Sequence, residues 1–153
     1  MKKTLMALTL TAALSTTAMA ATDGVAVTLG YTNDNVINEE GLRAEAELRT
    51  AYSLGREVRV GLTTLTDTDA KLLTYGAYVG YAVPVFTNVK VVPRLGIEQY
   101  RDADELLGFV DAGLEYTITD GLTVDARAKY SEAFDSDVDM DGVSYMFGVT
   151  KAW

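Results

Sequence analysis

The chain has 153 residues, with 22 aspartates and glutamates against 13 lysines and arginines, and its formal net charge is −9. This acidic balance argues against nucleic acid as a partner and against simple attraction to anionic lipid surfaces. The sequence contains no cysteine and no histidine, which excludes disulfides, thiolate metal sites, His-based catalytic triads and the commonest zinc ligand.

The first twenty residues have the pattern of an export signal. A basic start, Lys2 and Lys3, precedes an apolar run over residues 5–14, and Ala18-Met19-Ala20 forms a small-residue cleavage site. The apolar run is too short to span a bilayer, and no cysteine follows the site to carry a lipid anchor. We therefore expect a cleaved signal peptide over residues 1–20 and one domain of 133 residues over 21–153.

The rest of the chain has no run of about twenty apolar residues that would form a membrane-spanning helix. Instead, apolar side chains alternate with small or charged ones at period two, which is typical of β-strands. The alternation predicts eight strands, over residues 24–32, 42–52, 57–66, 72–83, 89–98, 106–117, 122–131 and 142–153. Short turns are predicted over 53–56, 84–88 and 118–121, and polar loops over 33–40, 67–69, 101–104 and 132–141.

Eight strands leave about 17 residues for each strand and its connection, and a strand that crosses a membrane needs about 9–11. Pro93 lies within the fifth predicted strand, although proline cannot donate a hydrogen bond to a neighbouring strand. We expect a β-bulge at this position.

The last predicted strand, residues 142–153, has one large, mostly apolar face and one small face, and it ends on Trp153. A final alternating strand with an aromatic end resembles the closing strand of bacterial outer-membrane β-barrels. The resemblance implies that this ending serves as a signal to the barrel-assembly machinery.

The two faces of the strands indicate which side is the lumen. An eight-stranded lumen is only wide enough to be filled by side chains, so the smaller, glycine-rich face should point inward. That face also carries seven cations and seven acids, Lys90, Lys129 and Glu57 among them, and such a balance suits a closed interior. The predicted lumen charge network is Arg43, Glu45, Glu47, Arg49, Arg59, Arg94, Glu98, Asp111, Glu115, Asp125 and Arg127.

Aromatic residues distinguish a membrane barrel from a soluble barrel of the lipocalin kind, whose charges point outward. On the apolar face, two rings are predicted, as membrane interfaces select: an upper ring of Tyr31, Tyr75, Tyr130 and Tyr145, and a lower ring of Tyr52, Tyr81, Tyr116 and Trp153. The mature chain thus resembles the small eight-stranded outer-membrane proteins of the OmpA/OmpX kind. The resemblance implies an all-β, antiparallel up-and-down transmembrane barrel in the outer membrane of a Gram-negative bacterium, surrounded by lipid and lipopolysaccharide.

The expected role is structural or surface-interacting, because no residue set forms a recognisable catalytic site. A narrow channel and a soluble periplasmic ligand-binding barrel are the alternatives, and an enzyme acting on lipid would need an activated serine. No cofactor is expected beyond loosely bound Ca²⁺ or Mg²⁺. Asp137, Asp139 and Asp141 resemble the start of a calcium loop, although the twelfth position is Gly148 instead of glutamate. The four loops, counted together with the adjacent Glu105, hold thirteen acids. The oligomeric state is not assigned.

Overall fold

The computed structural model describes residues 24–51, 56–135 and 140–153. Eight antiparallel strands form one closed barrel in which each strand pairs with its neighbours in sequence and the last pairs with the first. The strands are β1 (Val25–Asp34), β2 (Glu39–Ala51), β3 (Glu57–Thr66), β4 (Leu72–Phe86), β5 (Val89–Tyr100), β6 (Glu105–Thr119), β7 (Leu122–Ala133) and β8 (Asp141–Ala152). Within the described residues, no helix is long and apolar enough to cross a membrane.

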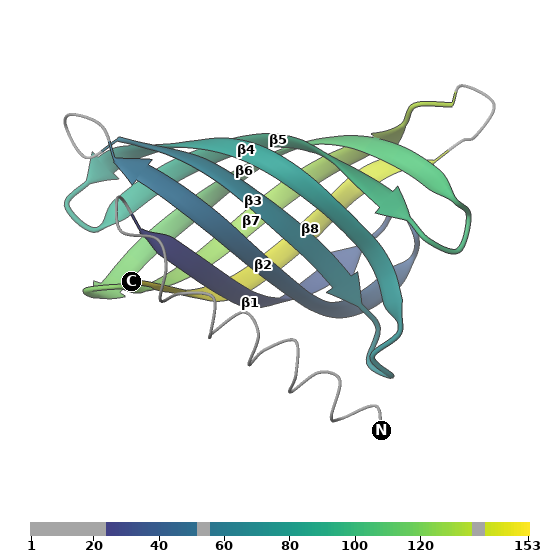
Figure 1. The fold of residues 1–153 in the computed structure, drawn as a ribbon, viewed down its shortest axis with the longest axis horizontal. Coiled ribbons are helices and arrows are strands. Elements are labelled where there is room, and N and C mark those ends of the chain that lie inside the picture. The colour runs from purple at the N-terminus through teal and green to yellow at the C-terminus, as the bar shows by residue number, and fades with distance from the viewer. Residues whose placement is uncertain (1–23, 52–55, 136–139) are drawn as a thin grey trace.

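The barrel has two distinct ends (Figure 1). At the turn end β2 meets β3, β4 meets β5 and β6 meets β7, and the chain finishes there at Trp153. At the loop end lie the four other connections, from β1 to β2, β3 to β4, β5 to β6 and β7 to β8. The strands cross the long axis of the barrel obliquely, so residues that pair across strands lie at different heights.

The eight strands confirm the number predicted from the alternation, with ends that differ by a few residues. β1 continues to Asp34, and β2 begins at Glu39 within the predicted first loop. β4 continues through most of the predicted turn 84–88 and ends at Phe86, where its register with β5 shifts. The end of β1 was predicted too early and the start of β2 too late because polar residues on the inner face near a strand end have the composition of a loop.

The predicted bulge at Pro93 is wrong. Pro93 pairs with Ala112 of β6 in a register without a shift. On the β4 side the pairs Gly80↔Arg94 and Val83↔Val91 keep one register across the stretch that contains Pro93, although the two pairs between them are missing. β5 therefore accommodates the missing N–H by leaving out local pairs rather than by adding a residue.

Alternate residues of each strand point into the barrel, and the inner face carries the charges. The outer face is apolar: Leu48, Val60 and Leu114 are exposed over 57 %, 51 % and 58 % of their surface. A soluble protein of this size rarely leaves so many large apolar side chains exposed. The arrangement is the reverse of a soluble ligand-binding barrel, and that alternative is wrong.

Aromatic side chains lie outward near both ends of the barrel. Tyr31, Tyr75, Tyr130 and Tyr145, all exposed, lie close to the loop end of their strands. Tyr81, Tyr116 and Trp153 are exposed toward the turn end, and Tyr52 falls outside the described residues. Amphipathic rings in two such belts are typical of the two water interfaces of a membrane barrel.

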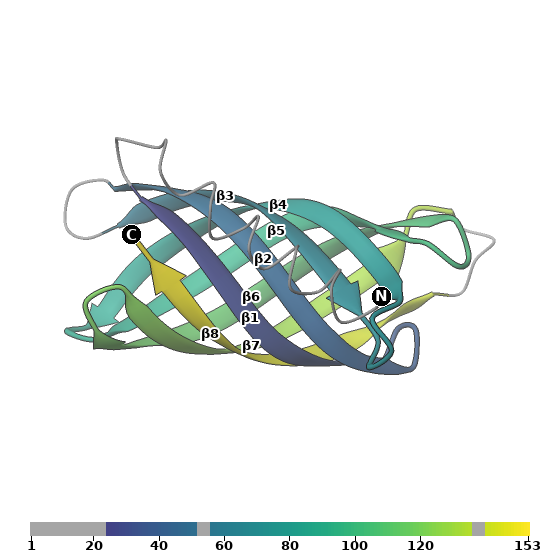
Figure 2. The same cartoon turned by 60° about the horizontal axis from the view of Figure 1, so that its bottom comes forward.

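The barrel closes where β1 and β8 lie side by side (Figure 2). The pairing runs from Ala26↔Ala152 to Asp34↔Ser144, and it confirms that the last strand pairs with the first.

Candidate functional site

The candidate site is the charged interior, and the eleven residues of the predicted network all lie on the inner face. Ten of them have exposed fractions of only 0–7 %: Arg43, Glu45, Glu47, Arg59, Arg94, Glu98, Asp111, Glu115, Asp125 and Arg127. The eleventh, Arg49, keeps 11 % of its side chain exposed and lies 2.5 Å from Glu47. Strand alternation places each of them because successive side chains point to opposite faces.

Arg59 on β3 is fully buried and lies within ion-pair distance of three carboxylates. Its Nη1 lies 2.6 Å from Oε1 of Glu115 on β6, and its Nη2 lies 2.7 Å from Oε2 of Glu57 on its own strand. Oε1 of Glu47 on β2 is 3.6 Å from Nη1, and Lys90 also pairs with Glu57. One planar guanidinium thus bridges strands on different walls of the barrel.

Arg94 on β5 makes a second bridge. Its Nη1 lies 2.7 Å from Oε2 of Glu45 on β2, and its Nη2 lies 2.7 Å from Oδ2 of Asp111 on β6. The guanidinium carbon lies 4.2 Å from the centre of the Tyr78 ring, which gives a cation–π contact. The Tyr78 hydroxyl donates a hydrogen bond of 2.9 Å to Glu47, so the aromatic ring joins the polar network on both sides.

Arg127 on β7 connects these bridges. Its Nη2 lies 2.8 Å from Glu115, its Nε lies 2.9 Å from Asp125, and its Nη1 lies 3.8 Å from Asp111. Because Glu115 also binds Arg59, ion pairs run without interruption from β2 to β7. Gly113 makes room for Arg127, since a Cβ there would lie 2.9 Å from the Arg127 Cγ.

A separate cluster lies toward the loop end. Nζ of Lys129 lies 2.6 Å from Glu98 and 3.2 Å from Asp34, and the Ser131 hydroxyl donates to Glu98 over 3.2 Å. Asp34 lies within the predicted polar loop 33–40 and was therefore expected among the exterior acids. That expectation is wrong, because Asp34 is only 2 % exposed. In β1 the even-numbered residues, such as Thr32, point inward. Continuing this alternation by one step would have placed Asp34 inside.

Asp34 changes the charge balance of the interior. It adds an eighth acid to the seven acids and seven cations predicted from the sequence. The cluster has the residue types of a serine–lysine catalytic pair, but Ser131 and Lys129 are both fully buried. A substrate therefore has no access to either side chain in this conformation.

Arg43 is the least satisfied charge of the interior. Its Nη1 lies 3.7 Å from Glu45 and donates to Thr63 over 3.3 Å, while its Nε and Nη2 have no hydrogen-bond partner. Oγ1 of Thr32 also has no hydrogen-bond partner, and Thr32 and Arg43 line one small cavity. This cavity, about 10 Å³ of space for the centre of a water molecule, has room for roughly one water.

The predicted calcium loop lies mostly outside the residues that the structure describes. Asp137 and Asp139 fall outside the described residues, and Asp141 is exposed as the first residue of β8. Among the residues that the structure describes, no group of three or more carboxylates is arranged to hold a metal ion.

A closed eight-stranded barrel with a charged interior, an apolar exterior and aromatic belts at both ends defines a transmembrane β-barrel. The model of the outer membrane protein beta-barrel domain family matches residues 6–150. The chain belongs to this family and lies in the outer membrane. No curated protein matches it significantly.

Solved structures support the fold at low sequence identity. Ail of Yersinia pestis in a phospholipid nanodisc is 16 % identical, with a TM-score of 0.56, over 86 % of this chain and 99 % of that chain. Neisserial surface protein A is 14 % identical, with a TM-score of 0.50, over 84 % and 93 %. A de novo designed transmembrane β-barrel is 12 % identical, with a TM-score of 0.60, over 88 % and 98 %. Similarity at this level concerns the fold alone.

Proposed function

We propose that the protein is a structural or surface-interacting barrel whose lumen is closed by its charge network, and that it has no catalytic activity. The observation that carries this proposal is the chain of ion pairs from wall to wall. Arg59 reaches Glu115 across the barrel, and Arg94 reaches Glu45. Removing one partner of such a buried pair leaves an uncompensated charge, so a pore through the lumen would require several pairs to separate together.

A narrow channel is the alternative. The small cavity beside Arg43 is the observation that favours it, because unpartnered donors there can bind water. A cavity with room for about one water does not form a continuous wet path, and ion conduction needs one.

The loop end supports a role at the cell surface. Short turns lie on the periplasmic side of such barrels and longer loops on the exterior side, so the acidic loops face outward. Acidic loops beside lipopolysaccharide phosphates repel them unless Ca²⁺ or Mg²⁺ bridges the two, and we include this bridging in the proposal. Recognition of the last strand by the barrel-assembly machinery belongs to it as well.

Conductance in planar bilayers tests the closed lumen. The refolded protein should insert and produce no steady single-channel currents in about 1 M salt, where the Debye length is about 3 Å. Insertion is checked on the same preparation by the fluorescence of Trp153, the single tryptophan. Steady currents from inserted wild-type protein would overturn the closed lumen in favour of the narrow channel.

A further inference from the structure

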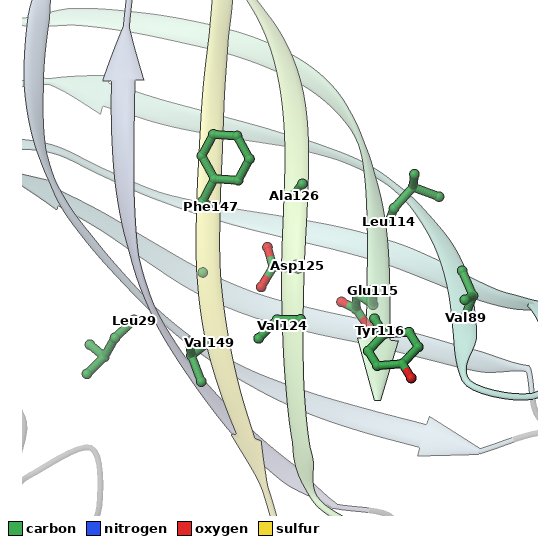
Figure 3. Close-up of a pocket in the computed structure, with 11 residues that line it drawn as sticks. Leu29, Val89, Leu114, Glu115, Tyr116, Val124, Asp125, Ala126, Phe147 and Val149 are labelled. Atoms are coloured by element: carbon green, nitrogen blue, oxygen red, sulfur yellow. The ribbon is translucent and has the colours of Figure 1, made fainter. Parts of the chain in front are cut away.

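The outer face carries an apolar groove of about 650 Å³ over β6, β7, β8 and the adjacent part of β1 (Figure 3). Its floor is Ala126 on β7, which lies in register between Phe147 of β8 and Leu114 of β6. Figure 3 shows the small Ala126 side chain between these two larger ones. The small Ala126 side chain leaves open the space between Phe147 and Leu114 that belongs to the groove.

A second row of side chains forms the half of the groove nearer the turn end. Leu29 pairs with Val149, Val149 with Val124, and Val124 with Tyr116, so the row crosses four strands. Ala126 is four residues from the start of β7, about 13 Å along the strand. The groove therefore faces the leaflet on the periplasmic side, where the short turns lie.

A single cation stands at the turn-end mouth of this groove. Lys151 is exposed on the outer face of β8, two residues beyond Val149, and it pairs in register with Leu122 of β7. On the strands that the structure describes, every other lysine and arginine points into the barrel. Lys151 forms no ion pair among these residues; its Nζ lies 6.0 Å from the centre of the Trp153 ring.

We propose that the groove binds an acyl chain of one anionic glycerophospholipid whose phosphate pairs with Lys151. The outer-membrane location places lipid against this face, and the unpaired ammonium supplies charge complementarity at the depth where a long lysine side chain reaches the headgroups. The net charge of −9 repels anionic surfaces in general, so the attraction is local to this position. The site goes beyond the closed lumen and does not depend on it.

Retention of lipid tests the proposal. The refolded barrel is placed in nanodiscs of phosphatidylcholine with an equal share of phosphatidylglycerol, and mass spectrometry after release counts the lipids that stay bound. The wild type should retain phosphatidylglycerol about fivefold over phosphatidylcholine, the ratio that one basic residue near a membrane surface supplies. Lys151→Gln should remove this preference and leave total retention nearly unchanged.

Ala126→Phe fills the groove and should lower retention of both lipids. Ala77→Phe is the matched control, because Ala77 is also an exposed alanine, between Leu62 and Ile97 on β3 and β5, and does not line the groove. The control should retain lipid as the wild type does. Equal loss in both phenylalanine variants, or a preference that survives Lys151→Gln, would overturn the proposal.

A measurement on the wild type avoids dependence on variant folding. Phosphatidylglycerol with a spin label on its acyl chain should broaden the NMR signal of the Ala126 methyl group more than that of Ala77. Equal broadening would mean general lipid contact only and would overturn a specific site. A wild-type dimer that Ala126→Phe abolishes would assign the groove to a second copy of the chain instead. The conductance measurement is independent of all these results.

Discussion

At the scale of single residues, the interior is stable only because each buried charge has a partner. Moving an arginine and its carboxylates out of water carries a desolvation penalty that their attraction offsets only in good geometry. Arg59 meets this condition, with two ion-pair distances of 2.6 and 2.7 Å and no exposed surface. Lys71 is the contrast: it pairs with Asp102 at 2.5 Å between two loops, where both side chains are about half exposed.

We expect Arg59→Met to lower the free energy of unfolding by about 3–5 kcal/mol, because Glu57 and Glu115 are left buried without their cation. Urea unfolding of the refolded barrel in lipid vesicles measures it. Replacing Glu115 by leucine in the same chain should restore part of the loss. Lys71→Met should change stability little, since exposed pairs contribute little; a loss as large as that of Arg59→Met would contradict this account.

At the scale of elements, the seam between β1 and β8 decides closure. Gly30 pairs with Gly148 across it, and a Cβ on Gly30 would lie 3.1 Å from the Gly148 Cα and closer still to the Phe147 carbonyl oxygen. These neighbours are backbone atoms that cannot move aside without separating the strands. At Gly108 a Cβ would meet only the far end of the Phe134 ring, at 3.0 Å.

Gly30→Ala should therefore destabilise the barrel by about 1–3 kcal/mol, the usual range for overpacking. Gly108→Ala should be tolerated because the Phe134 ring can rotate away. The comparison uses the fraction that migrates as compact, unheated barrel on gels, together with urea midpoints. If Gly30→Ala were tolerated as readily as Gly108→Ala, backbone contact at the seam would not limit closure.

The end of β8 carries a second test of closure. The Trp153 backbone exchanges two hydrogen bonds with Val25, of 3.0 and 3.3 Å. Deleting Trp153 removes both bonds and the interfacial ring, whereas Trp153→Phe keeps the bonds and an aromatic ring. We expect the deletion to lower the folded amount in the outer membrane more than the substitution does, as measured by protease-protected protein. Equal amounts of the two variants would refute this role.

At the scale of the whole molecule, charge is separated along the barrel. The interior nearly balances its cations and acids, while the loop end is acidic. Lys71, a cation at this end, donates a hydrogen bond to Asp102. This hydrogen bond raises the pKa of Lys71 above its usual value. This surface is where divalent cations would act.

Calcium titration followed by NMR should shift the amide signals of residues 132–142, with Kd on the order of 10⁻⁴–10⁻³ M, as in weak extracellular calcium modules. Asp139→Asn should weaken the effect, because it removes one anionic oxygen ligand. Asp120→Asn at the turn end, remote from these loops, is the control and should leave the titration unchanged. An absence of shifts up to about 10 mM would leave only a solvated acidic loop.

The amino-acid sequence is sufficient to predict which face each strand turns to the lumen. Period-two alternation placed Arg43, Glu45 and Arg94 inward, and the aromatic residues marked the belts, because side-chain direction in a strand is a local property. The alternation did not locate strand ends, because Asp34 has the composition of a loop residue. Pro93 suggested a bulge that β5 does not form.

Which charges meet across the lumen depends on the closed barrel. Arg94 binds Glu45, 49 positions away, and Lys129 binds Asp34, 95 positions away. These partners depend on the tilt and stagger of the closed barrel, which set the height of each side chain along the axis. The same closure brings Leu29 of β1 beside Val149 of β8 at the outer groove. Alternation specifies a face and barrel geometry specifies a height, so partners on distant strands meet only when all eight strands have closed.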